Sequence, residues 1–275
     1  MLSNLIKRNK HRTYQLSKFI LHYFQLYISR LNKHVKFQLK DFKSIPIIII
    51  SFNQFSSLKK LIDFLIANGY KNIIVIDNGS SYPPLIEYFQ QLDHRVVLHR
   101  LNENMGHLCF WKNEAIFKTY SKGYYVVTDP DVVPVFECPN DFLNTFRKML
   151  DKAYDRTKVG FSLKIDDIPV ANPNRDKIIK WERGLYSKKI NEHAQKAPID
   201  TTFALYRPGY KYRLKDFTKA WRTNFPLQAR HCGWYIDINN LTEEQIYYQK
   251  TANESASWLT DKKGVLTNET HRNIY

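Results

Sequence analysis

The chain of 275 residues is 43% hydrophobic and 15% aromatic, a composition typical of a folded protein with a substantial core and not of a disordered one. No apolar run approaches the roughly 20 residues that span a bilayer, and the basic N-terminus lacks an apolar segment with a small-residue cleavage site. We therefore expect neither a membrane span nor a signal peptide. Cys109, Cys138 and Cys232 are few and far apart, which favours free thiols in the reducing cytoplasm over disulfides or a zinc site.

The formal net charge of +16 is unevenly distributed along the chain. Residues 1–40 contain nine Lys or Arg residues and no Asp or Glu. The modest excess in the remainder suits a protein that attracts a phosphorylated substrate.

Residues 1–40 predict a basic amphipathic helical extension, in which apolar residues recur at helical spacing. Such a helix can lie on an anionic membrane. It can also pack its aromatic stripe on the main body or on another subunit, which is the commoner role of an apolar stripe. The stripe consists of Leu16, Phe19, Ile20, Tyr23, Phe24, Tyr27 and Leu31.

From residue 45 onwards, strand and helix signals alternate, which predicts an α/β fold whose mostly parallel central sheet is flanked by helices. Ser56 or Ser57 is the expected cap of the first helix, and Gly69 is its expected C-terminal glycine. Strands are predicted at residues 45–50, 72–76, 96–98 and 124–128, with helices at residues 58–66, 85–92 and 107–121 between them.

The second half of the chain is less regular. The polar stretch 168–198 is typical of a loop region that shapes a substrate site. Thr242 and Gln245 predict a capping box at the start of a late helix. A helix is also expected at residues 141–154, with strands at residues 160–165 and 202–206.

Polar clusters follow three of the predicted strands, and in parallel sheets ligands bind beyond the carboxyl ends of the strands. The clusters are Ser51-Phe52-Asn53, Asp77-Asn78-Gly79 and Asp129-Pro130-Asp131. In extended chain, residues i and i+2 point to the same side, so Asp129 and Asp131 can converge on one point. Such a pair of hard oxygen ligands suits Mg²⁺ or Mn²⁺, which would in turn hold a diphosphate. An ordinary acidic turn is the alternative.

These residues resemble the GT-A glycosyltransferases, in particular the large inverting family 2, over roughly residues 44–240 and most strongly over 44–135. The resemblance implies a GT-A, Rossmann-like nucleotide-binding fold. Ser51-Phe52-Asn53 is similar to the family's Ser-Tyr-Asn, whose aromatic lies near the nucleotide base, and Phe52 could stack there or could be a core aromatic. The resemblance also implies that Asp77 contacts the base, which would be uracil.

Two further segments carry the resemblance. Asn104-Met105-Gly106 is similar to a family loop that closes over the nucleotide, and Gly106 permits close backbone approach to a phosphate. Asp129-Pro130-Asp131 is similar to the Asp-x-Asp motif, in which the first Asp faces the ribose and metal-bound water and the last ligates the metal. Lys112 could neutralise the departing diphosphate, or it could be a solvated helix residue.

In the C-terminal half, residues 199–207 and 229–235 also look like segments of bacterial family-2 enzymes. These enzymes often bring a C-terminal His to the metal or diphosphate. His231 is the candidate here, since imidazole accompanies carboxylates around Mn²⁺. A histidine packed beside Trp234 is the alternative.

An inverting transfer needs a carboxylate base to take the proton of the acceptor hydroxyl. The chain departs from the family here, because no clear Glu-Asp pair precedes the His231 segment. Asp200 is the first candidate for this base. Glu182 is the second, with Trp181 beside it offering an apolar face to a sugar ring. Three further carboxylates remain open: Asp166, Asp167 and Asp216.

Together with these residues, the resemblance implies a metal-dependent glycosyltransferase that uses a nucleotide-sugar donor, a UDP-sugar, and a glycan acceptor of a surface polysaccharide or lipid-linked oligosaccharide. Residues 41–135 would form the nucleotide-sugar-binding half, and residues 136–275 the acceptor-binding half with the C-terminal helices. Residues 1–40 would be the extension, open to peripheral contact with the inner face of the cytoplasmic membrane.

Two other classes fit less well. A sugar nucleotidyltransferase needs a Gly-rich basic loop after its first strand, and the chain has Ser51 to Phe55 there. A nucleic-acid-binding protein would suit the pI of 9.6. The basic excess lies mostly in residues 1–40, however, so no nucleic-acid partner is expected.

Overall fold

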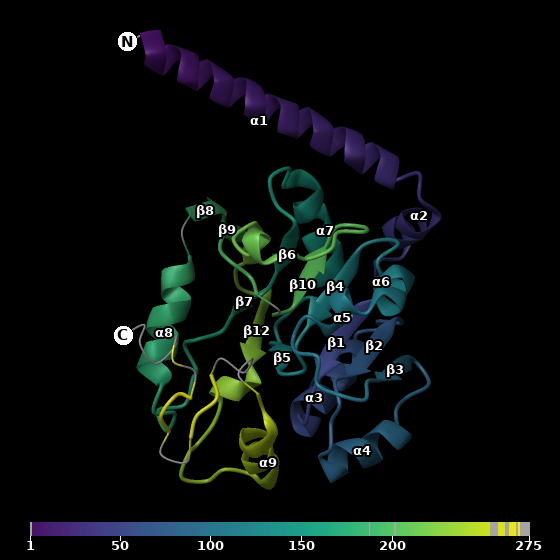
Figure 1. Cartoon of the computed structure of the whole chain (residues 1–275), viewed down its shortest axis with the longest axis vertical. Helices are drawn as coiled ribbons and strands as arrows, with labels where there is room; N and C mark the ends of the chain where they lie inside the picture. The colour runs from purple at the N-terminus through teal and green to yellow at the C-terminus, as the bar shows by residue number, and fades with distance from the viewer. Residues whose placement is uncertain are drawn as a thin grey trace.

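The computed structural model describes residues 2–186, 188–200, 202–253, 258–261, 264–267 and 269. Within these residues a nine-stranded sheet has the order β3-β2-β1-β4-β10-β6-β11-β9-β8 and is covered by helices on both faces (Figure 1). This arrangement confirms the α/β class and the central sheet that the sequence predicts.

The first four strands are parallel and form the half of the sheet that the alternating pattern predicts. Their register aligns Ser51 with Asp77, so the polar ends of β1 and β2 lie side by side. Both strands are buried along their whole length because helices cover both faces. The strands are β1 (Ile47–Ser51), β2 (Ile73–Asp77), β3 (Val96–Arg100) and β4 (Tyr125–Thr128).

The helices of this half differ from the prediction in two details. The first helix, α3, begins after Gln54 with no side-chain cap from Ser56 or Ser57. The expected helix at residues 107–121 is two helices, because Asn113 is extended and its side chain caps the second of them by accepting from Ile116 N–H. The helices are α3 (Phe55–Ala67), α4 (Pro83–Gln90), α5 (Cys109–Lys112) and α6 (Glu114–Tyr120).

The second half of the sheet mixes parallel and antiparallel pairs. β10 (Ala204–Tyr206) runs antiparallel to β4, and β6 (Lys158–Gly160) follows it. The outer strands are β11 (Ala220–Thr223), β9 (Ala194–Lys196) and β8 (Lys188–Asn191). A separate three-stranded sheet consists of β5 (Val132–Pro134), β12 (Gln228–His231) and β7 (Ser162–Leu163).

The polar stretch 168–198 is not the loop that its composition predicts. It contains a helix, α8 (Arg175–Leu185), and the β8–β9 hairpin. Only Ile178 and Glu182 of this helix are buried, so its inner face is too narrow to give a clear apolar period. The predicted capping box at Thr242 and Gln245 is present and begins α9 (Glu243–Thr251). The remaining elements are α7 (Phe142–Lys152) and the short helices η1 (Phe42–Ser44), η2 (Leu214–Asp216) and η3 (Cys232–Trp234).

The N-terminal residues form α1 (Leu2–Ser29) and α2 (Lys33–Lys40), and α1 lies across one end of the body (Figure 1). Among the described residues no helix is long and apolar enough to cross a bilayer. The predicted stripe is largely exposed to solvent, so most of it does not pack on the body as an apolar stripe usually does.

Candidate active site

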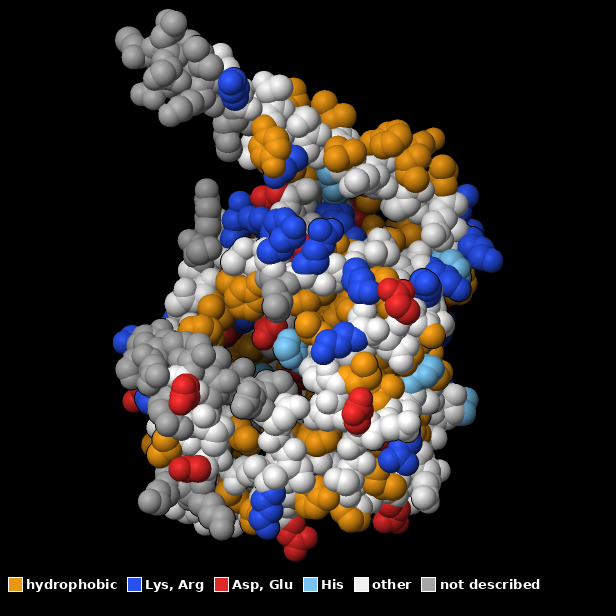
Figure 2. Space-filling view, viewed as in Figure 1, with side chains coloured by type: hydrophobic (Ala, Val, Ile, Leu, Met, Phe, Trp, Pro, Cys, Tyr) orange, Lys and Arg blue, Asp and Glu red, His pale blue; other side chains and the backbone are white. Residues whose placement is uncertain are grey.

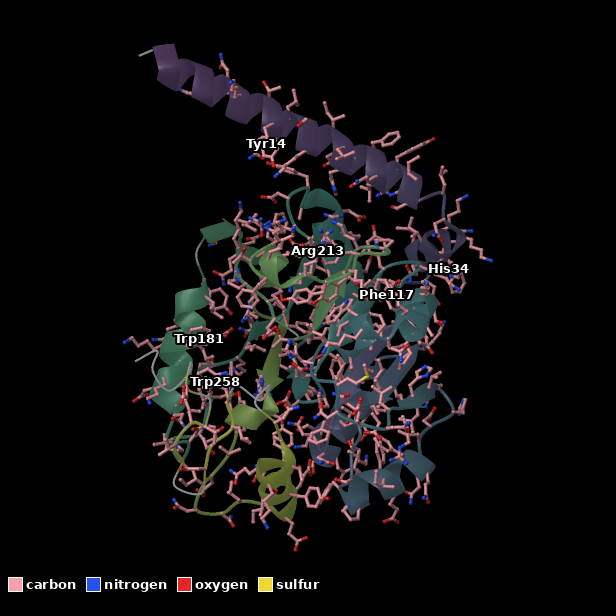
Figure 3. All side chains as sticks on the ribbon, viewed as in Figure 1. Tyr14, His34, Phe117, Trp181, Arg213 and Trp258 are labelled. Carbon is pink, nitrogen blue, oxygen red and sulfur yellow. The ribbon has the colours of Figure 1, made fainter. Side chains whose placement is uncertain are left out.

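A cavity of about 570 Å³ opens at the carboxyl ends of β1 and β4 and is walled by both halves of the chain. The far wall comes from α8 and α9, with Trp181 and Trp258 on the α8 side (Figure 3). Eight of the twelve predicted site residues line this cavity: Phe52, Asn104, Gly106, Asp129, Asp131, Glu182, Asp200 and His231. The fold therefore gathers residues separated by up to 179 positions, while Ser51, Asn53, Asp77 and Lys112 lie outside the cavity lining.

Asp129 and Asp131 lie in the short turn between β4 and β5. The side chain of Asp131 is buried, with 6% of the residue exposed, and Asp129 is half-buried. The Cys232 N–H donates to the Asp131 carbonyl over 2.6 Å, and β5 pairs antiparallel with β12 beside it. This pairing fixes the turn against the segment that carries His231.

His231 lies close to Asp131 because β12 pairs with β5 and places His231 opposite Val132, the residue after Asp131. Nδ1 of the imidazole lies 3.3 Å from Oδ2 of Asp131 and, although buried, has no hydrogen bond of good geometry. The ring also stacks on Trp234, with centroids 4.8 Å apart and planes 10° apart. His231 is thus packed beside Trp234 and directed at Asp131 at the same time.

The donor set at this turn fits a divalent cation. A carboxylate oxygen and an orphaned imidazole nitrogen next to a second carboxylate are the ligand types that Mn²⁺ accepts. Gly233 makes this close approach possible, because a Cβ there would lie 3.1 Å from Asp131 Oδ2 and 3.2 Å from His231 Cε1. No group of three or more His, Cys, Asp or Glu side chains within the described residues is already arranged around a metal position.

The loop at Asn104 is braced by hydrogen bonds from both sides. Asn78 Nδ2 donates to Asn104 Oδ1 over 2.8 Å, and the Met105 N–H donates to Asn78 Oδ1 over 2.9 Å. The Gly106 N–H donates to Asn104 Oδ1, and Gly106 has a positive φ of 78°. Lys112 donates to the Met105 carbonyl over 3.1 Å and is exposed. Lys112 therefore supports this loop instead of facing the cavity.

Asp77 is fully buried at the end of β2. Its Oδ1 accepts from the Ser80 N–H and its Oδ2 from Arg100 Nε, each over 3.0 Å. The structure thus does not bring Asp77 to the cavity surface, where the resemblance had it meet a base.

Ser51 and Asn53 also serve the framework around the cavity. Ser51 is fully buried, and its carbonyl accepts from the Asn78 N–H over 2.8 Å. Asn53 adopts a left-handed φ of 49°, its Oδ1 accepts from the N–H groups of Ser81 and Tyr82, and its Nδ2 donates to Thr251. Asn53 therefore ties β1 to the start of α4 and to the end of α9.

Glu182 lines the cavity but is already paired. Its carboxylate forms an ion pair with Arg222, and the two side chains are only 2% and 4% exposed. Arg222 also donates to the Pro198 carbonyl over 2.7 Å. Burial, reinforced by the negative charge of Glu182, raises the pKa of the neighbouring Tyr186 to about 12.

Asp200 is the exposed carboxylate of the cavity wall. Its backbone carbonyl accepts from the buried ammonium of Lys158 at 3.5 Å. Burial lowers the pKa of Lys158 to about 7, and the negative charge of Asp200 opposes that shift. Tyr212 lies against the same ammonium, with its ring centroid 4.3 Å from Nζ.

The three other carboxylates left open as bases do not line the cavity. Asp166 pairs with Lys164 at 2.9 Å, and Asp167 pairs with Arg230 at 2.6 Å. Asp216 is buried and pairs with Lys219 at 2.6 Å. Position and pairing together leave Asp200 as the candidate base most open to an acceptor.

No signal in the sequence indicated that α9 forms a wall of the cavity. Glu244 accepts from the Ser56 N–H over 3.0 Å, and the Tyr247 hydroxyl donates to the Ser81 carbonyl over 3.1 Å. These bonds hold Tyr248 beside the carboxylate turn, where burial, followed by the charges of Asp131 and Asp129, raises its pKa. The capping box predicts where this helix begins in the sequence, but not that it packs against the cavity.

The α/β fold, with its cavity at the carboxyl ends of β1 and β4, agrees with a GT-A-type fold. The sequence model of glycosyl transferase family 2 matches residues 47–210, which is more than half of the chain. The chain therefore belongs to glycosyl transferase family 2. A search of curated proteins found no match.

Three solved structures are similar to this chain in fold. PcManGT, a mannosyltransferase from Pyrobaculum calidifontis in complex with GDP-Man and Mn²⁺, is 12% identical over 86% of this chain and 70% of its own, with a TM-score of 0.40. Residues 1–349 of S. aureus TarS are 12% identical over 75% and 68%, with a TM-score of 0.43. HddC from Yersinia pseudotuberculosis complexed with GMP-PN is 14% identical over 60% and 74%, with a TM-score of 0.34.

Proposed function

We propose that this glycosyltransferase uses Mn²⁺ or Mg²⁺ to transfer a sugar from a UDP-sugar to a hydroxyl of a glycan acceptor, with inversion. The observation that carries the proposal is the approach of His231 Nδ1, which has no hydrogen bond, to Asp131 Oδ2 over 3.3 Å in a cavity wall that Asp129 also lines. Asp131 and His231 would hold the metal, and Asp129 would face the ribose. The metal would stabilise the negative charge of the departing diphosphate.

The other residues of the proposed donor site fall into two groups, those that line the cavity and those that support them from behind. Phe52, Asn104 and Gly106 line the cavity and would contact the nucleotide. Ser51, Asn53, Asp77 and Lys112 would support those contacts from behind, through the hydrogen bonds that fix the strand ends and the loop.

Asp200 is the proposed base for the acceptor hydroxyl. It is exposed at the cavity wall, whereas Glu182 is neutralised by Arg222. A carboxylate that stays accessible can accept a proton as the hydroxyl oxygen attacks the anomeric carbon. Trp181 and Trp258 offer apolar faces on the same side of the cavity, which suits the ring of a glycan acceptor (Figure 3).

We further propose that the transfer takes place in the cytoplasm and serves a surface polysaccharide or a lipid-linked oligosaccharide. All three cysteines are free, which suits a reducing compartment.

The proposal is tested by thermal denaturation with UDP, with and without Mn²⁺. UDP with Mn²⁺ at 100 times its Kd should stabilise the folded chain by about 2.7 kcal/mol. Asp131→Asn should lose this stabilisation. Asp166→Asn is the matched control, because Asp166 is 74% exposed and lies outside the cavity. Absence of UDP stabilisation with Mn²⁺ and with Mg²⁺ would contradict the proposal.

A further inference from the structure

Helix α1 carries an apolar face that is largely exposed to solvent. Each of the seven residues of the stripe is between 42% and 64% exposed. We call this surface the outer face of α1; it consists of Leu16, Phe19, Ile20, Tyr23, Phe24 and Tyr27, together with Leu31 just after the helix. Exposed apolar surface of this extent on a soluble domain marks an interaction site.

The body holds α1 by a different side. His22 Nε2 lies 2.7 Å from the Asp151 carbonyl, Leu26 is 8% exposed, and Arg30 pairs with Asp151 at 3.5 Å. Residues 22, 26 and 30 follow each other at intervals of four and so form one side of the helix. Within the outer face, Phe19 makes an edge contact with Tyr154 of the body, with ring centroids 5.7 Å apart. Packing of the helix on the body therefore does not explain why the outer face is apolar.

Charge decides which partner fits this face. Residues 1–40 contain nine Lys or Arg and no Asp or Glu. A second copy would bring two such segments together, and like charges in contact repel. An anionic bilayer offers an apolar interior beneath a negatively charged surface, so it complements both properties at once.

We propose that the outer face of α1 lies on the surface of an anionic membrane, with its apolar side chains in the acyl boundary and the Lys and Arg residues of the segment at the phosphate headgroups. α1 would then lie in the plane of the interface, which agrees with the absence of a membrane-spanning helix among the described residues.

The body continues the basic surface below α1. Figure 2 shows Lys and Arg side chains gathered directly beneath the helix, above a hollow in the same face, and Figure 3 places Arg213 in this region. The loop around Arg213 also exposes Lys211, Lys215 and Lys219. Each cation near the bilayer would strengthen binding about fivefold through its attraction to anionic lipid, so the basic side chains of the body would add to the membrane affinity of α1.

The experiment is flotation of the full chain with vesicles of phosphatidylcholine alone or mixed with phosphatidylglycerol. The chain should float with the anionic vesicles far more than with the neutral ones, and added salt should weaken binding. Two variants with the same new charge separate the faces: Phe24→Glu on the outer face, and Gln25→Glu on the neighbouring exposed position outside it.

The new charge alone should weaken binding about fivefold in both variants. Phe24→Glu should lose roughly a further tenfold, because it also removes an inserted phenyl ring. Both variants should keep the wild-type melting temperature and response to UDP with Mn²⁺, so a failure here is distinct from a failure of the proposed enzyme activity.

Three results would overturn the proposal. One is no flotation of the wild-type chain with anionic vesicles, and another is equal binding by the two variants. The third is self-association of the wild type in sedimentation velocity that Phe24→Glu abolishes, without any binding to vesicles. That result would assign the outer face to a second copy of the chain.

Discussion

The buried ion pair between Glu182 and Arg222 yields a sharp prediction about stability. Glu182→Gln keeps the size of the side chain but removes its charge. Both partners are almost fully buried, at 2% and 4% exposure, so the guanidinium of Arg222 would remain charged without water or a carboxylate to stabilise it.

The size of the effect follows from this burial. Removal of one partner of a buried pair costs about 3–5 kcal/mol, because the other charge is left uncompensated. For a domain of this size, each kcal/mol lowers the melting temperature by roughly 2–4 °C, so Glu182→Gln should melt about 6–20 °C below the wild type. Removal of both charges with Arg222→Met should restore much of the loss.

The assay is urea and thermal unfolding of the wild type, the two single variants and the double variant. Asp63→Asn is the control, because the Lys59–Asp63 pair has side chains 49% and 58% exposed and should contribute less than about 0.5 kcal/mol. A Glu182→Gln variant within about 1 kcal/mol of the wild type would refute the reasoning, as would a double variant less stable than both single ones.

Three further predictions concern the cavity and the sheet beneath it. Asp200→Asn should keep the stabilisation by UDP with Mn²⁺ but lower transfer by about 100-fold or more, and unchanged transfer would remove Asp200 from the mechanism. Gly233→Ala should weaken Mn²⁺-dependent UDP binding, because its Cβ would lie 3.1 Å from Asp131 Oδ2; Gly184→Ala, whose Cβ meets nothing within 4 Å, should not. Burial lowers the pKa of Lys158 to about 7 from 10.5, so between these pH values the unfolded chain binds the extra proton and stability rises with pH. Lys158→Met should therefore stabilise the chain more at pH 7 than at about pH 9.5, and an equal gain in melting temperature at both would contradict this.

Much of the donor half was predictable because its signals are local. The strand of residues 45–50 reads as a continuous β-branched run, and the structure places β1 at Ile47–Ser51 with every residue buried. The capping box at Thr242 was equally predictable, since its two reciprocal hydrogen bonds lie within one turn of helix. The helix within residues 168–198 could not be predicted, because the buried side of α8 is narrow and one of its two buried residues is a glutamate.

The sequence by itself determined the alternation of strands and helices in the first half, the carboxylates at the end of β4 and the apolar stripe of α1. These follow from periodicity and from the type of residue at each strand end, which neighbouring residues are enough to specify. Only the tertiary structure decided that His231 meets Asp131, that Arg222 neutralises Glu182, and that the stripe of α1 faces away from the body. Each of these depends on contacts between segments far apart in the chain, and a pattern of single residues does not encode which segments pair.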